Sequence, residues 1–140
     1  MAFARLAALA AISIGILLAQ NGATFKARLS AVAADARTRP QLAGIGSATA
    51  TLSGNQLTIT GSFEGLLSPA TTAQVHAASA AGIRGPVIHD LTIAQAASGS
   101  LSGTLDLTPQ QVEQLHKGGL YIQIQSQKAP DGVLWGWLLR

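Results

Sequence analysis

The 140-residue sequence contains no cysteine. Disulfide bonds and thiolate metal sites are therefore excluded, and the redox compartment stays undetermined. Aromatic residues are scarce as well, at 4% of the chain. The whole aromatic set is Phe3, Phe25, Phe63, Tyr121, Trp135 and Trp137. The core must therefore be built mainly from Ala, Val, Ile and Leu, with Gly and Thr between them.

Charged residues are also few, at 11% of the chain, and the formal net charge is +3. A protein that neutralises many phosphates needs a higher density of basic residues, so we expect no nucleic-acid partner. The length supports one domain, since a mode of roughly 100–150 residues per domain leaves no room for two.

The longest apolar run lies near the N-terminus, where only Ser13 interrupts residues 6–19 and Arg5 precedes them. At ~1.5 Å per residue this run covers ~21 Å of a ~30 Å hydrocarbon core, the length of a signal-peptide segment. Counted back to Phe3, it approaches the ~17 residues that can just span a bilayer. Residues 1–23 are thus predicted to be an N-terminal hydrophobic helix, either a signal peptide or an uncleaved membrane anchor.

Cleavage after Ala19 is disfavoured because Leu17 occupies a position that normally holds a small residue. We therefore lean towards retention of the segment. The expected location is extracytoplasmic, on the periplasmic side, with the domain tethered to the membrane by residues 1–19. If the leader is cleaved, the domain is secreted.

Short segments in which apolar and polar residues alternate predict β-strands in the rest of the chain. They cover residues 24–32, 46–52, 56–66, 73–78, 87–93, 98–107, 119–127 and 133–140. The first has a basic outer face formed by Lys26 and Arg28. One helix interrupts the pattern, with Thr108 as N-cap and Pro109 at its first position. Residues 24–140 are thus expected to form an all-β domain, a Greek-key antiparallel β-sandwich with one short helix.

Three stretches carry a family resemblance: GIRGPV at 82–87, LTPQQVEQL at 107–115 and GLY at 119–121. With the order of the strands around them, they make the chain from about residue 24 to residue 140 similar to the CHRD domain, named from chordin. The resemblance implies a Greek-key β-sandwich like that of copper/zinc superoxide dismutase, located outside the cytoplasm.

The sequence departs from this family where the family has histidines. Typical members carry His-x-His at the segment that is Gln74-Val75-His76 here, and Asn-Val-His at the segment that is Gln123-Ile124-Gln125. Only His76 remains, and glutamine is a poor substitute for imidazole on copper, zinc or iron. We therefore predict no cofactor, no metal site and no enzymatic activity. His76 is a weak metal candidate, and a metal-dependent dismutase-like enzyme is the alternative.

The C-terminal hairpin has one apolar face too many. In the first strand Gln123 and Gln125 alternate with apolar residues, which indicates one buried and one solvent-exposed face. In the return strand both faces are apolar. Leu134, Gly136 and Leu138 are expected in the core, while Val133, Trp135, Trp137 and Leu139 form a second face. Family members are polar at the first three of these four positions.

This second face, together with Gln123 and Gln125, is predicted to bind a partner, because buried tryptophans anchor interfaces. Within the chain, residues 35–42 or the leader are the alternative cover. The leading hypothesis is a non-catalytic accessory or structural subunit that docks on a membrane protein complex, such as a respiratory or photosynthetic one, or on another protein. A soluble secreted binding domain is a further alternative, and no small-molecule substrate is expected.

Overall fold

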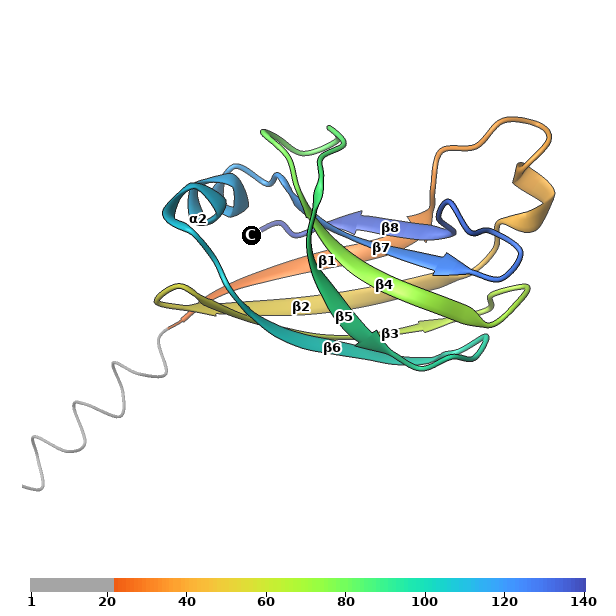
Figure 1. The fold of residues 1–140 in the computed structure, drawn as a ribbon, viewed down its shortest axis with the longest axis horizontal. Coiled ribbons are helices and arrows are strands. Elements are labelled where there is room, and N and C mark those ends of the chain that lie inside the picture. Colours follow the sequence, from red (N-terminus) through yellow and green to blue (C-terminus); the bar gives the residue numbers. More distant parts are fainter. Residues whose placement is uncertain (1–21) are drawn as a thin grey trace, which may run out of the picture.

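The computed structural model describes residues 22–140 as a single β-domain (Figure 1). The hydrophobic helix predicted near the N-terminus falls on residues that lie outside this range. Within residues 22–140, no helix has both the length and the apolarity needed to cross a bilayer.

All eight predicted strands are present, with ends that differ from the prediction by a few residues. They are β1 (Ala23–Ala31), β2 (Ile45–Ser53), β3 (Gln56–Glu64), β4 (Ala70–Ala77), β5 (Val87–Ile93), β6 (Gly99–Asp106), β7 (Leu120–Ser126) and β8 (Leu134–Trp137). A short 3-10 helix, η1 (Arg39–Gln41), lies in the polar loop after β1. Every pair of neighbouring strands is antiparallel.

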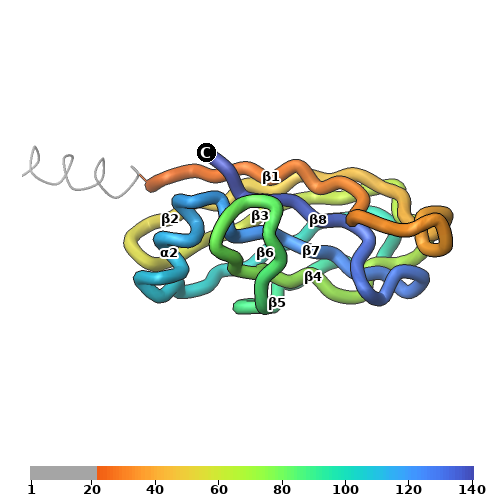
Figure 2. Tube along the Cα trace, turned by 90° about the horizontal axis from the view of Figure 1, so that it is seen from above, coloured from red at the N-terminus to blue at the C-terminus, as the bar shows by residue number. Residues whose placement is uncertain are grey.

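The strands close into a barrel in the order β1-β2-β3-β6-β5-β4-β7-β8. The neighbours β3-β6-β5-β4 form a Greek key, because β3 pairs with the last of three consecutive strands. The sequence predicted a Greek-key β-sandwich, and the observed fold is sandwich-like, with its strands closed into one barrel. β1 pairs with β2 and also with β8, and β5 pairs with both β4 and β6, so both sides of the sandwich are closed. The barrel is flat when seen from above (Figure 2).

The predicted helix is α2 (Pro109–His116), and its N-terminus matches the sequence signal. The Thr108 hydroxyl accepts a hydrogen bond from the Gln111 amide at 3.1 Å, and the Gln111 side chain accepts one from the Thr108 amide at 3.0 Å. This capping box satisfies two amides that have no partner within the helix. α2 lies at the end of the barrel where Leu115 is buried (Figure 1).

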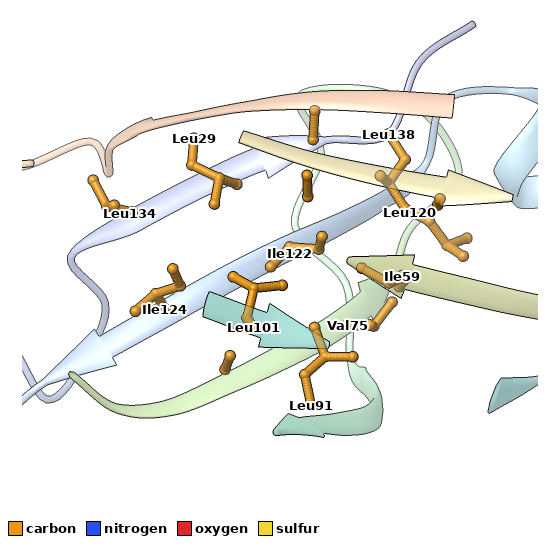
Figure 3. Close-up of a cluster of buried hydrophobic side chains, with 14 of the residues drawn as sticks. Leu29, Ile59, Val75, Leu91, Leu101, Leu120, Ile122, Ile124, Leu134 and Leu138 are labelled. Atoms are coloured by element: carbon orange, nitrogen blue, oxygen red, sulfur yellow. The ribbon is translucent and has the colours of Figure 1, made fainter. Parts of the chain in front are cut away.

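The barrel interior is filled by the inward residues of each strand, as the period-2 pattern predicts. Most are Ala, Leu, Ile and Val, together with Phe25 and Phe63. Figure 3 shows how aliphatic side chains from opposite walls meet, among them Leu29, Ile59, Val75, Leu101, Ile122 and Leu134. The core is thus dominated by aliphatic side chains, as the small aromatic content of the chain predicts.

Candidate binding site

The outer surface of β4, β7 and β8 carries a row of aromatic side chains. Cross-strand pairing sets the row, because His76 on β4 lies opposite Tyr121 on β7, and Tyr121 lies opposite Trp137 on β8. The next row places Gln123 opposite Trp135. Side chains directly opposite each other on one face of an antiparallel pair are close enough to pack.

These side chains form one aromatic cluster. His76 stacks on Tyr121 with ring centroids 4.6 Å apart and an interplanar angle of 12°. The Tyr121 ring lies 4.9 Å from that of Trp137 and 6.1 Å from that of Trp135. The two indoles meet edge to face at 4.8 Å. Such offset and edge-to-face arrangements stabilise aromatic pairs beyond the burial of their area.

The loop of residues 79–86 covers this cluster from outside. The Tyr121 hydroxyl accepts a hydrogen bond from the Gly85 amide at 3.1 Å and donates one to the Gly85 carbonyl at 3.2 Å. His76 Nδ1 lies 2.9 Å from the same carbonyl. Because a carbonyl can only accept, Nδ1 carries the proton. His76 Nε2 is enclosed and has no hydrogen-bond partner among the described residues.

The same loop brings a positive charge over one of the tryptophans. The Arg84 guanidinium carbon lies 4.4 Å from the centroid of the Trp135 ring, which is the geometry of a cation–π contact. The side chain of Arg84 is otherwise exposed. Arg84 therefore adds a cation to an aromatic surface that remains reachable from solvent.

Beside the loop, a groove of about 280 Å³ runs between β1 and β8. We call it the tryptophan groove. Its lining residues are Lys26, Arg28, Ser30, Ala81, Gly82, Trp135, Gly136, Trp137 and Leu139. Trp135 and Trp137 are half-buried, and Leu139 is 49% exposed. The Trp137 indole N–H is enclosed and has no hydrogen-bond partner among residues 22–140.

The pairing of β1 with β8 arranges the two walls of the groove. Lys26 lies opposite Leu139, and Ser30 lies opposite Trp135. Arg28, midway between them, therefore lies opposite Trp137. The two basic side chains of the groove are both exposed and face its apolar wall from one strand away. In the part of the chain that the structure describes, no acidic side chain lines this groove.

A second hollow, of about 350 Å³, lies between residues 32–42 and the turn at residues 128–132. Its charged lining is mixed, with Asp35 and Asp131 on one hand and Arg84 and Lys128 on the other. Asp35 accepts hydrogen bonds from the Thr38 amide at 3.0 Å, the Thr38 hydroxyl at 3.1 Å and the Arg37 amide at 3.0 Å. These bonds, those of Thr38 first, lower the pKa of Asp35 below its ordinary value.

The predicted binding face is only partly exposed. Val133 was predicted to point outward, and this was wrong, since it is 1% exposed and belongs to the core. It precedes β8, and the turn at Gly132, where φ is +129°, reorients the chain so that alternation begins only at Leu134. The predicted core positions Leu134 and Leu138 are confirmed, each with 0% exposure.

The strand β7 was predicted to have one solvent-exposed face, and this too was wrong. Gln123 is 6% exposed, and its Nε2 donates to the Asp131 carbonyl at 3.0 Å, so it holds the closing turn. Gln125 is half-buried. Tyr121 is covered by residues 79–86, whereas residues 35–42 were the cover that we considered from the sequence. Cover by the leader concerns residues outside the described range.

The three histidines lie on separate elements. His76 is on β4, His89 is on β5, and His116 packs at the end of α2, its ring centroid 5.8 Å from that of Phe25. Within residues 22–140, no group of three or more His, Cys, Asp or Glu side chains is placed to hold a metal ion. The environment of His76 is therefore a stack on Tyr121 and a hydrogen bond to Gly85.

Sequence reasoning missed Tyr121 and Arg84 as parts of this surface. The basic face of β1 was visible in the alternation of Lys26 and Arg28, but nothing local indicates that β1 closes the barrel against β8. That juxtaposition depends on pairing between the two ends of the chain.

Comparison with known proteins gives one match. The model of the family described as the CHRD domain matches residues 25–138, which is most of the chain. No curated protein and no solved structure matches the chain at a significant level.

Proposed function

The chain belongs to the CHRD domain family, and from this premise we propose that it is a non-catalytic accessory subunit that docks on a membrane protein complex. Members of this family are typically extracellular. The contact surface is the tryptophan groove. The N-terminal apolar segment tethers the domain on the extracytoplasmic side of the membrane.

The observation that carries this proposal is that two half-buried tryptophans, Trp135 and Trp137, lie on the outer surface of a closed barrel. The barrel interior is already filled by aliphatic side chains together with Phe25 and Phe63, so Trp135 and Trp137 are not needed to fill it. Tryptophan removes a large area from water when it is covered by a partner, and it is enriched among the residues that dominate binding energy. Leu139, exposed at the rim, extends the same apolar surface.

The lack of catalysis is supported by the chemistry of the side chains present. His76 has its Nδ1 bound to a carbonyl and its ring stacked on Tyr121, so its role in the fold is to hold residues 79–86. The described acidic residues form no pair in hydrogen-bond contact that could act as acid and base. The loss of two family histidines, at Gln74 and Gln125, points the same way.

The proposal is tested by purifying the tagged full-length protein from native membranes. The double variant Trp135→Arg with Trp137→Gln is expected to lose its co-purifying complex and to keep the circular dichroism of the folded barrel. Leu67→Arg is the matched control, because Leu67 is an apolar side chain that is 49% exposed away from the groove. Equal recovery of partners with the double variant and the wild type would contradict docking through this surface.

A further inference from the structure

The tryptophan groove has a one-sided charge that constrains what it can bind. Among residues 22–140, Lys26 and Arg28 are its only charged lining residues, and both are basic. Arg84, stacked on Trp135, adds a third cation at the edge of the groove. A bound partner that covers the indoles must also face these cations, and a basic or neutral partner would bury them without compensation.

The spacing of the cations adds a geometric constraint. Lys26 and Arg28 are two residues apart on one face of β1, which places their Cα atoms about 6.6 Å apart. An extended chain lying along the groove repeats its side chains on one side at the same interval. Carboxylates at alternate residues of such a chain therefore meet Lys26 and Arg28, and the residues between them point to the opposite wall.

That opposite wall is apolar. Trp135 and Trp137 on β8, and Leu139 just after it, point outward at alternate positions. They lie opposite Ser30, Arg28 and Lys26. From Trp135 to Leu139 the groove is about 13 Å long, which accommodates about four or five residues of an extended peptide. An alternation of acidic and aliphatic residues thus matches both walls at once.

The shape of the site favours a chain over a flat surface. The indoles are recessed between β1 and the loop that carries Ala81 and Gly82, and Arg84 covers one face of Trp135. Residues that enter a lipid bilayer need to protrude from the protein, because the headgroup region is broad and planar. A narrow segment can enter the groove where a bilayer cannot.

We infer that the tryptophan groove binds an extended segment of a partner protein in which acidic residues alternate with aliphatic ones, the carboxylates pairing with Lys26 and Arg28 and the aliphatic side chains covering Trp135 and Trp137. This inference rests on the proposed docking function and names the chemistry of its partner.

The chain offers a direct optical test, because Trp135 and Trp137 are its only tryptophans and both line the groove. Full-length protein is titrated with a synthetic peptide of about eight residues that alternates glutamate and leucine, and the tryptophan emission is followed. We expect a saturable change in emission. Replacing the glutamates by glutamine is expected to weaken binding about tenfold, the effect of losing two partly exposed charge pairs.

Charge reversal locates the contact. Lys26→Glu with Arg28→Glu is expected to abolish binding of the glutamate–leucine peptide, and both positions are exposed, so the fold is retained. The matched control is Arg37→Glu with Arg39→Glu, which changes the net charge equally at exposed positions outside the groove. The control is expected to bind the peptide like the wild type.

Three results would overturn the inference. One is the absence of a peptide-induced change with the wild type, and another is equal binding by the Lys26/Arg28 variant. The third is an emission change with vesicles of phosphatidylglycerol and phosphatidylcholine, or with an oligothymidylate, that exceeds the change with the peptide. These would indicate a lipid surface or a single-stranded nucleic acid instead.

Failure of this inference can be told apart from failure of docking itself. If the Lys26/Arg28 variant still co-purifies with the complex while the Trp135/Trp137 variant does not, docking through the groove stands and the acidic segment is wrong. If both variants co-purify normally, the docking surface is wrong as well.

Discussion

The hydroxyl of Tyr121 bonds both polar backbone atoms of Gly85, accepting from its amide at 3.1 Å and donating to its carbonyl at 3.2 Å. The two residues are 36 positions apart in the sequence. This contact fixes residues 79–86 over the outer face of β7, and it thereby helps to position Ala81 and Gly82, which line the tryptophan groove beside its two walls.

Tyr121→Phe is expected to destabilise the protein by about 2 kcal/mol, because the Gly85 amide loses its partner in a part-buried position. The aromatic stack remains, so the barrel stays folded. Urea unfolding measures the loss, and hydrogen exchange of the Gly85 amide reports the loop directly. The amide of Ala50, in the β2 ladder, is the internal control and should exchange only through global unfolding. Unchanged protection at Gly85 would contradict the assigned contact.

Gly85→Ala is expected to cost about 3 kcal/mol, since a Cβ at this position would overlap the backbone carbonyl of Ala77. The loop would have to move away from β4 to admit it. Gly82→Ala is the matched control in the same loop. A Cβ there meets nothing within 4 Å, although φ is +82°, so only about 1–2 kcal/mol of backbone strain is expected. Equal midpoints in thermal unfolding for the two variants would contradict close packing of Gly85.

Much of the barrel can be predicted from local pattern. Alternation in β3, with Leu57, Ile59 and Phe63 inward, fixes which face is buried, and the capping box at Thr108 marks the start of α2. These signals are local, because each depends on a few neighbouring residues. The family match over residues 25–138 confirms the resemblance seen in the motifs at 82–87, 107–115 and 119–121.

The surroundings of β7 could not be predicted in this way. Tyr121 and Gln123 have the alternation of a half-exposed strand, yet both are buried. Tyr121 is covered by the distant loop of residues 79–86, and Gln123 by the turn that joins β7 to β8. The candidate site also depends on tertiary pairing. Arg28 lies opposite Trp137 only because β1, the first strand, pairs with β8, the last. Local pattern shows which side of a strand is apolar, but tertiary pairing determines what covers it.

Val133→Ala tests the corrected position of the residue before β8. Because Val133 is 1% exposed and belongs to the core, its truncation is expected to cost about 2 kcal/mol. Val87→Ala, at a valine that is 45% exposed, is the matched control and should cost about 0.5 kcal/mol or less. Urea denaturation of both variants provides the comparison. Similar small losses in the free energy of unfolding for both variants would indicate that the Val133 side chain lies on the outer face.

The carboxylate of Asp35 should respond to acid in a defined direction. Its pKa is lowered by hydrogen bonds from Thr38 and Arg37, so the folded loop binds this proton less readily than the unfolded chain. The contribution of Asp35 to loop stability is therefore fully present above about pH 3.9, the ordinary value of an aspartate, and is lost as the pH falls through the lower folded value. A carboxyl-carbon NMR titration should give a midpoint below that ordinary value, and the amides of Arg37 and Thr38 should exchange faster once Asp35 is protonated.

Thr38→Val separates the causes, since it removes the hydroxyl donor and leaves the Thr38 amide in place. The Asp35 midpoint should move up towards the ordinary value in this variant and remain below it, because two backbone donors persist. Thr51→Val, at an exposed threonine on β2, is the matched control and should leave the midpoint unchanged. A wild-type midpoint at or above the ordinary value would show that these hydrogen bonds do not persist in solution.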